Sequence, residues 1–266
     1  MDGKPVGFFG VAVMKTFVFP AFNVATSFHS VDGRFELYDV NTGTWDLVVV
    51  GPDFARELVI GTNVREDHTV DLGDVTVHRG WTIHGRVTHS DGSPVVNAEV
   101  EIDCDPWLAV PDELTARARG CYRGLSGSNG AYVIRNVKKI DPLGNSQRIR
   151  ASAGNEVSAL ALVPEQDRTI DITVLRSGRV VGNIVGDVPP DAVVVAHSRH
   201  GNNEWGFAVG NPRPDGTFEL DRVAPGDYDV AVSLRGHDGA TEHIAVRSDQ
   251  TTSVTVMAPS MLPAPP

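Results

Sequence analysis

One short pattern occurs three times in the chain, and it constrains the fold more than any other feature. Its clearest copy is Asp215–Leu234, where an Asp-Gly turn, an apolar-polar alternation, a Pro-Gly turn and a longer alternation follow one another. Related phrases begin at Asp32 and Asn129. A period of two puts apolar side chains on one face of a strand, and Asp-Gly and Pro-Gly favour tight turns. The pattern therefore predicts a small β-unit, written three times.

The length and composition agree with three such units. The chain has 266 residues, so three copies would hold roughly 89 residues each, enough for a modest core. Its 27 Gly and 17 Pro are spread along the sequence, as many short strands joined by turns require. We expect domains at 1–78, 79–177 and 178–258, and a disordered proline-rich tail at 259–266.

A second repeated phrase shows that the first copy begins differently. Asp2–Val6 matches Asp91–Val95 without a gap. In the second copy the strand Trp81–Val87 precedes this phrase, and the third copy has a counterpart at Val180–Ile184, whereas the first copy has none. A missing first strand leaves a sheet edge with unpaired backbone groups. We expect the first domain to be the least ordered, or to be completed by upstream sequence of a longer polypeptide.

The alternation also predicts individual elements. Trp45 occupies the position of Tyr228 and is expected in the core, and the best helix candidate is Asp112–Arg119. In the first copy we expect strands over 10–19, 25–31, the Asp-Gly phrase at 32–37, 43–50, 57–60 and 69–77. In the second copy the closing strand is expected over 169–174, and in the third copy strands are expected over 180–185, 192–197, 205–209, 217–220, 228–234, 243–246 and 252–257.

Net charge and hydropathy exclude two classes of partner. The formal charge is −11, from 34 acidic and 23 basic residues. Non-specific binding to nucleic acid or anionic lipid needs the opposite sign. No apolar run approaches the ~20 residues that a membrane span requires. We therefore expect an acidic, solvated surface, no nucleic-acid partner and no membrane span in this chain.

The only two cysteines, Cys104 and Cys121, flank an insertion in the second copy. If the flanking strands form a hairpin, the two residues can face each other and form a disulfide, which would stabilise the domain by about 3 kcal/mol. Two free structural thiols are the alternative. A disulfide would require an oxidising compartment, and the spacing does not fit a CxxC redox or zinc motif.

No set of reactive residues emerges from the sequence. His78, His84 and His89 lie near the junction of the first two copies, but on a strand the third would face away from the other two, and no HExxH accompanies them. The chain also lacks a Gly-x-Ser-x-Gly elbow, a phosphate loop and an EF-hand. We predict no catalytic residue, no metal site, no cofactor and no enzymatic activity.

The ordered set of phrases resembles the carboxypeptidase regulatory-like domain, which belongs with the transthyretin-like and collagen-adhesin B-type sandwiches. The second copy carries Gly85-x-Val87, Asp91-Gly92-x-Pro94-Val95, Ala98-x-Val100 and Asn129-Gly130-x-Tyr132. The third carries Gly182-x-Ile184, Ala192-x-Val194, Asp215-Gly216-x-Phe218 and Pro225-Gly226-x-Tyr228. The resemblance implies an all-β chain of tandem seven-stranded antiparallel Ig-like or transthyretin-like β-sandwiches, the first without its first strand.

The resemblance also implies a function class. It indicates a non-catalytic structural or interaction module, a spacer or adhesion scaffold, of an exported bacterial protein that is secreted, periplasmic or on the cell surface. Its partner would be a protein or a polysaccharide, and the chain would be part of a longer polypeptide. The alternative is a carbohydrate-binding accessory region, because sugar rings stack on exposed aromatic side chains such as Trp107 in the insertion and Trp205. For each tryptophan, packing is the simpler interpretation.

Overall fold

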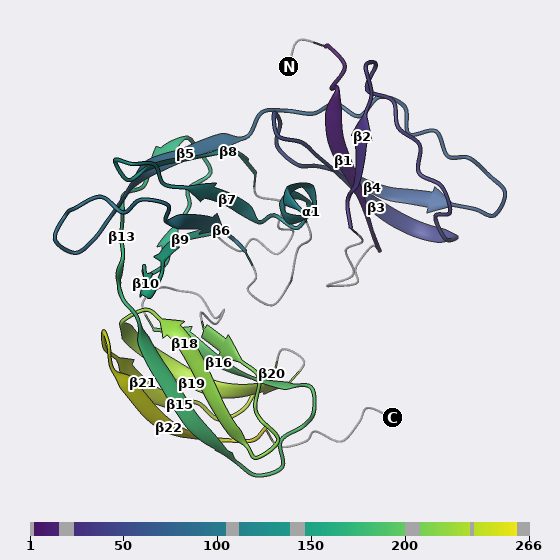
Figure 1. Cartoon of the computed structure of the whole chain (residues 1–266). Helices are drawn as coiled ribbons and strands as arrows, with labels where there is room; N and C mark the ends of the chain where they lie inside the picture. The colour runs from purple at the N-terminus through teal and green to yellow at the C-terminus, as the bar shows by residue number, and fades with distance from the viewer. Residues whose placement is uncertain are drawn as a thin grey trace. The chain divides into compact units, whose positions relative to one another are not determined.

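The computed structural model describes residues 3–15, 24–104, 112–138, 147–199, 208–234 and 237–259 (Figure 1). Nearly all regular structure in these residues is β-strand, which confirms the predicted all-β class. The chain forms two compact units. The first unit comprises Met1–Val87, Pro94–Arg150 and Leu160–Ile172, and the second comprises Thr88–Ser93, Ala151–Ala159 and Thr173–Pro266. The division into three domains at 1–78, 79–177 and 178–258 stays a prediction.

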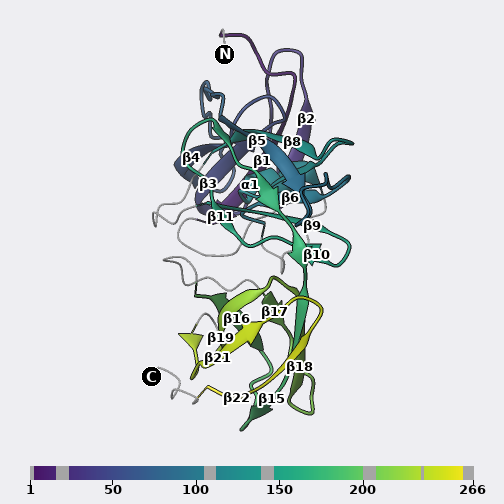
Figure 2. The same ribbon diagram turned by 90° about the vertical axis from the view of Figure 1, so that its left-hand side faces the viewer.

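The second unit contains the third copy, which is a two-layer sandwich (Figures 1 and 2). One sheet has the order β18-β15-β22, and the other has the order β17-β16-β19, with β20 and β21 also paired to β19. The strands are β15 (Gly178–Val185), β16 (Ala192–Ser198), β17 (Ala208–Gly210), β18 (Thr217–Val223), β19 (Gly226–Leu234), β20 (His237–Asp238), β21 (Glu242–Val246) and β22 (Thr251–Met257). One pair departs from the antiparallel pattern, because β15 and β22 run parallel.

The core of this sandwich follows the alternation that the sequence shows. Phe218 and Leu220 of β18 and Tyr228 and Val230 of β19 are buried in one cluster with Val180 of β15. Each of these side chains belongs to the inward set of its strand, so the period of two is what fills the space between the sheets. The strand positions predicted for this copy are confirmed within the described residues, apart from shifts of one to three residues at their ends.

Part of the second copy also belongs to the second unit. There β10 (Glu156–Val157) pairs with the end of β9 (Arg148–Ala153) and with β14 (Leu175–Arg176). In the same unit His89 Nδ1 lies 2.9 Å from a carboxylate oxygen of Glu156.

In the first unit, the first copy forms a four-stranded antiparallel sheet of order β2-β1-β3-β4. The strands are β1 (Phe8–Lys15), β2 (Thr26–His29), β3 (Gly43–Val50) and β4 (Glu57–Val64). Alternate residues of β1 and β3 fall into two separate clusters, one containing Val11 and Val49 and the other containing Ala12 and Val48. Both faces of this sheet are therefore buried.

Two strands predicted for the first copy are absent, and the cause is the same for both. Residues 34–37 and 69–77 belong to no strand. In the third copy, β18 and β22 both take their hydrogen bonds from β15, the first strand of that copy. The first copy has no described counterpart of β15, so these two segments have no ladder to join. Trp45 is a further correction: its side chain is half-buried rather than in the core, and its indole N–H donates to the Asn41 carbonyl at 2.7 Å.

The rest of the first unit comes from the second copy. β5 (Trp81–Thr88) pairs antiparallel with β8 (Ala131–Val137) and parallel with β12 (Arg168–Thr169). β6 (Glu99–Ile102) and β7 (Tyr122–Leu125) form a second antiparallel pair, and β9 pairs with β11 (Ala161–Leu162). The closing strand predicted at 169–174 is split into β12 and β13 (Ile172–Thr173). The predicted helix is confirmed as α1 (Glu113–Ala118).

Candidate functional site: the disulfide-closed insertion

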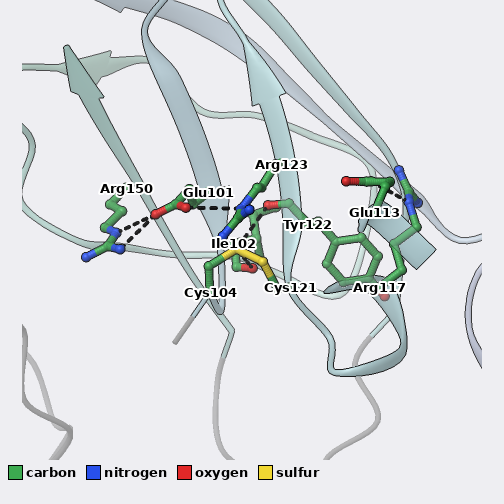
Figure 3. Close-up of a disulfide and its surroundings, with 9 residues drawn as sticks. All are labelled: Glu101, Ile102, Cys104, Glu113, Arg117, Cys121, Tyr122, Arg123 and Arg150. Carbon is green, nitrogen blue, oxygen red and sulfur yellow. Dashed lines mark hydrogen bonds and ion pairs between the residues drawn. A yellow bond between two sulfur atoms is a disulfide. The ribbon is translucent and has the colours of Figure 1, made fainter. Parts of the chain in front are cut away.

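The insertion between β6 and β7 carries the disulfide and, in its described residues 112–121, the helix. β6 and β7 pair with Ile102 opposite Tyr122, which brings the ends of the insertion together. Cys104 and Cys121 form a disulfide with their Cα atoms 4.4 Å apart (Figure 3). The bond closes a loop with a sequence separation of 17 residues. The hairpin thus positions the two sulfur atoms.

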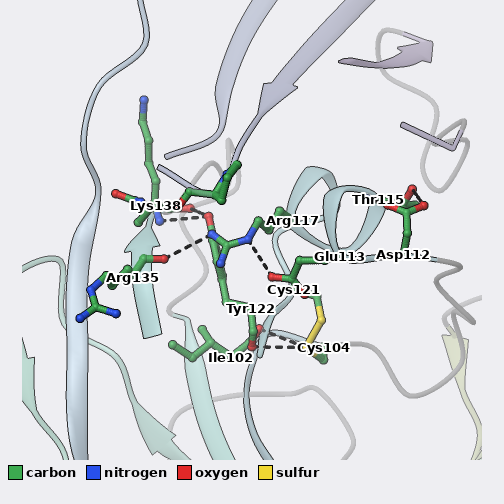
Figure 4. A network of polar contacts seen from close by, with 12 residues as sticks. Ile102, Cys104, Asp112, Glu113, Thr115, Arg117, Cys121, Tyr122, Arg135 and Lys138 are labelled. Atoms are coloured by element: carbon green, nitrogen blue, oxygen red, sulfur yellow. Dashed lines mark hydrogen bonds and ion pairs between the residues drawn. A yellow bond between two sulfur atoms is a disulfide. The ribbon is translucent and has the colours of Figure 1, made fainter. Parts of the chain in front are cut away.

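Local capping chemistry explains why the helix begins at Glu113. The Asp112 carboxylate accepts a hydrogen bond from the Thr115 backbone N–H at 2.8 Å and a second from the Thr115 hydroxyl at 2.8 Å (Figure 4). This satisfies one of the free N–H groups at the start of a helix. Glu113 and Arg117, one turn apart, form an ion pair at 2.7 Å. The Cys121 N–H donates to the Ala116 carbonyl at 3.0 Å, which joins the helix to the disulfide.

The inner face of α1 packs on the sheet of the first copy. Leu114 and Ala118 are buried in the cluster that contains Ala12 and Val48. The contact is close at Gly10, where a Cβ atom would lie 3.2 Å from the Leu114 side chain. A helix from the second copy therefore covers the face of β1 and β3 that would otherwise face solvent.

Hydrogen bonds fix the register of this packing. The Thr115 hydroxyl oxygen accepts from the Ala25 backbone N–H at 3.1 Å, and the Thr115 side chain is fully buried. Arg56 donates from Nη1 to the Ala118 carbonyl at 3.2 Å. The Thr115 hydroxyl thus donates to the Asp112 cap and accepts from a backbone group of the first copy, two contacts that an apolar side chain cannot make.

A second set of polar contacts joins the same two copies. The Asn136 side-chain amide donates to the Pro52 carbonyl at 2.9 Å, and its oxygen accepts from the Gly80 N–H at 3.3 Å. Glu57 binds Lys138 Nζ at 2.5 Å and His78 Nδ1 at 2.9 Å. The contacts of Asn136 with Pro52 and of Glu57 with Lys138 join the two copies, and the contacts with Gly80 and His78 lie where one copy passes into the next.

Tyr122 anchors the C-terminal side of the insertion. Its side chain is 1% exposed, and its hydroxyl donates to the Lys138 carbonyl at 3.1 Å and lies 3.1 Å from the Lys138 N–H, which donates to it. Burial raises the pKa of the Tyr122 phenol, because the charged form would lose its hydration. The Arg117 guanidinium lies 5.6 Å from the ring centroid and donates to the Arg135 carbonyl (Figure 4).

Glu101 of β6 forms an ion-pair cluster beside the disulfide. One of its oxygens accepts from Arg150 at 2.7 and 3.0 Å, and the other lies 3.2 Å from Arg123 Nε (Figure 3). One carboxylate between two guanidinium groups links the neighbouring strands β6, β7 and β9. Glu101 is largely buried, whereas both arginine side chains are about a third exposed, so solvent screens the remaining positive charge of the cluster.

The histidines considered as metal ligands have other partners. His78 binds Glu57, His84 binds the Thr169 hydroxyl at 3.0 Å, and His89 binds Glu156. Among the described residues no group of three or more His, Cys, Asp or Glu side chains could hold a metal ion. Within the same residues, no helix is long and apolar enough to cross a membrane.

The two tryptophans proposed as sugar contacts, Trp107 and Trp205, lie outside the described residues. What the sequence analysis missed is the docking role of the helix. The spacing of Asp112 and Thr115 could have signalled a helix cap, but nothing in the local sequence indicates that Thr115 also holds Ala25, which lies 90 residues away.

Comparison with known proteins gives weak similarities only. No protein-family model matches the chain, and no curated protein matches it. The minor pilin GBS52 of Streptococcus agalactiae is 12% identical over 70% of this chain and 99% of that chain, with a TM-score of 0.29. A streptococcal ancillary pilin is 13% identical over 98% and 95%, with a TM-score of 0.27.

The Bacillus anthracis TIE protein is 12% identical over 97% of this chain, with a TM-score of 0.26, and this chain spans about half its length (48%). TM-scores at this level support no argument about fold or function. The sandwich architecture therefore rests on the strand pairing described above, and the resemblance to carboxypeptidase regulatory-like domains stays a prediction.

Proposed function

We propose that the chain is a non-catalytic structural and interaction module, a spacer or adhesion scaffold, of an exported bacterial protein. The observation that carries this proposal is the packing of α1 on β1 and β3 in the first unit. There the Ala25 backbone N–H donates to the Thr115 hydroxyl at 3.1 Å. The polar contacts at this helix join β-elements of two copies, which is what a scaffold requires.

The disulfide supports the export part of the proposal. Disulfides such as Cys104–Cys121 persist in oxidising compartments and are rare where glutathione keeps thiols reduced. An acidic formal charge of −11 suits a surface that avoids nucleic acid and anionic lipid. The partner would be a protein or a polysaccharide, bound by shape and surface and without a cofactor.

Single-molecule stretching of the chain between handles at its two ends tests the scaffold role. We expect discrete force peaks, as cooperatively packed β-units give. The disulfide withholds a segment of 17 residues, so adding a reductant should lengthen the unfolded chain by about 58 Å, at ~3.4 Å per residue. Extension without force peaks would contradict the scaffold proposal, and an unchanged length on reduction would contradict the role of the disulfide.

A carbohydrate-binding accessory region is the second candidate. Its motivation is that Trp107 lies in the segment that Cys104 and Cys121 close, and a closed loop loses less conformational entropy when it binds. A glycan array with the intact chain tests it. A signal that Trp107→Ala abolishes and Trp45→Ala preserves would support this candidate, and the absence of any signal would remove it.

A further inference from the structure

The chain contains a single Asn-Gly dipeptide, Asn129-Gly130, and it lies in the connection between β7 and β8. Asparagine is a chemically labile residue, because the backbone nitrogen that follows it can attack its side-chain carbonyl carbon. A glycine in the next position leaves that nitrogen uncrowded, since it carries no Cβ atom. Asn129 is exposed, so water reaches it. The dipeptide is therefore a candidate for spontaneous deamidation.

The reaction at this dipeptide needs no reactant other than water. The Gly130 nitrogen would bond to Cγ of Asn129 and lose its proton, while the side-chain amide nitrogen leaves as ammonia. Water then opens the cyclic imide at one of its two carbonyl carbons. Cleavage of the new bond to Cγ gives aspartate. Cleavage of the original backbone bond gives isoaspartate, in which the main chain runs through the side-chain carbon atoms.

In the folded turn, hydrogen bonds hold both reacting groups. The Gly130 N–H donates to the Gly127 carbonyl at 2.9 Å, which engages the attacking nitrogen. The Asn129 side-chain oxygen accepts from the Ala131 N–H at 3.1 Å. The Arg86 guanidinium donates twice to the Asn129 backbone carbonyl, at 2.8 and 3.2 Å. Attack requires the nitrogen and the side-chain amide to leave these partners, so the turn has to open first.

The same turn is tied to the neighbouring strand β5. The Gly130 carbonyl accepts from the Val87 N–H at 2.8 Å. Gly130 has a φ of +77°, and a Cβ atom on it would lie 2.5 Å from the Val87 carbonyl and 3.2 Å from Pro94. Isoaspartate would insert one extra main-chain atom directly before Gly130. Packing this close leaves no room for the resulting shift, so the isoaspartate form could not close the turn on Val87.

The matching turn of the third copy shows that the other product fits. There the Asp215 carboxylate accepts from the Thr217 N–H at 2.9 Å, and the Gly216 N–H donates to the Arg213 carbonyl at 2.9 Å. These are the two hydrogen bonds that hold the reacting groups of the Asn-Gly turn. Aspartate at position 129 would therefore keep the turn and its pairing.

We propose that Asn129 is a spontaneous modification site that the closed turn protects. Opening of the turn at the end of the β5–β8 pair releases Asn129 to deamidate. The aspartate product lets the turn close again, whereas the isoaspartate product keeps the Gly130 carbonyl from the Val87 N–H. The reaction thus converts a transient local opening of the second copy into a lasting one.

Peptide mass spectrometry of the intact oxidised chain, kept at mildly alkaline pH, measures the reaction. We expect deamidation of Asn129 to be at least ~30-fold slower in the folded chain than in urea above its unfolding transition, the factor that two ordinary hydrogen bonds allow. Equal rates in the two states would overturn the protection. In urea, a rate no greater than that of Asn97, which precedes alanine, would overturn the site itself.

Two variants place the same dipeptide in the matching turns. Asp215→Asn creates it where the glycine N–H bond is also 2.9 Å, and it should be protected as strongly as Asn129. Asp32→Asn creates it where the Gly33 N–H donates to the Ser30 carbonyl at 3.4 Å, and it should react at least ~3-fold faster, since a longer bond restrains the nitrogen less. Each rate is divided by the rate of the same dipeptide in urea, which removes the effect of neighbouring residues. Equal ratios in the three turns would contradict the role of the turn.

The two products separate the effect of the main chain from that of the charge. The isolated isoaspartate form should show at least ~10-fold faster amide hydrogen exchange at Val87, because that N–H loses its acceptor. Asn129→Asp carries the same charge on an unaltered main chain and should exchange as the wild type does. Unchanged exchange in the isoaspartate form, or equally fast exchange in Asn129→Asp, would overturn the claim that isoaspartate keeps the turn open.

Discussion

Removing the Cys104–Cys121 disulfide by a double substitution to Ser should lower the free energy of unfolding of the first unit by about 3 kcal/mol. On the chain-entropy model, closing a loop with a sequence separation of 17 residues removes roughly 10–11 cal/mol/K from the unfolded chain, which is about 3 kcal/mol at 25 °C. The folded state should change little, because the β6–β7 pairing and the Tyr122 hydrogen bonds do not depend on the sulfur atoms.

The assay is urea unfolding monitored by hydrogen exchange, with the exchange measured separately for peptides of the first and second units. The transition of the first unit should move to lower urea with an equal or steeper slope, because the unfolded chain without the cross-link exposes more surface, and β15–β22 of the second unit should not move. A control in which the wild-type chain is reduced should match the double variant. A decrease in the free energy of unfolding below about 1 kcal/mol would refute the reasoning. It would mean that the unfolded chain is already restricted in this loop without the disulfide.

Three further predictions concern single side chains. Leu114→Ala should destabilise the first unit by about 2–4 kcal/mol, because it empties the contact with Gly10, and urea unfolding checks this. Thr115→Val keeps the volume but leaves the Ala25 N–H without its acceptor, and should cost about 1–3 kcal/mol in the same assay. Burial raises the pKa of Tyr228 to about 12, from an ordinary value of 10.0. The folded state therefore keeps its phenol proton where the unfolded chain loses it, so stability is full below pH 10 and falls by about 1.4 kcal/mol per pH unit until about pH 12. Tyr228→Phe should flatten that part of the alkaline unfolding profile, and it should cost about 1 kcal/mol at neutral pH because the hydroxyl donates to the Ala224 carbonyl at 2.8 Å. An alkaline profile that Tyr228→Phe leaves unchanged would contradict the assignment.

The sequence was sufficient to predict a strand or helix wherever the residues that pair with it or cap it lie in the same copy. The strands of the third copy followed from alternation and turns, because the first strand of that copy is present to pair with β18 and β22. The short helix followed from Pro111 and the residues after it, and its cap is local to Asp112. In these cases local preference and tertiary context point the same way.

The sequence failed where the outcome depends on a distant segment. Residues 34–37 repeat the phrase of Thr217–Leu220 but form no strand, because ladder hydrogen bonds belong to a pair of strands and not to one. Trp45 was matched to Tyr228, but its larger ring stays half-exposed, with its N–H on Asn41. The docking of α1 on the first copy was not predictable, because the sequence of a six-residue helix shows which of its faces is apolar but not which surface that face packs against.

The central claim is that the repeated phrase becomes a sheet only where a first strand lies beside it, and that the chain acts through such β-units. Residue-resolved amide hydrogen exchange of the unliganded chain tests it most directly. The account predicts slow exchange in Ala131–Val137 and Thr217–Val223 and fast exchange in residues 34–37, at least 100-fold apart, or roughly 2.7 kcal/mol of local opening free energy. Equal protection of the three segments would contradict it.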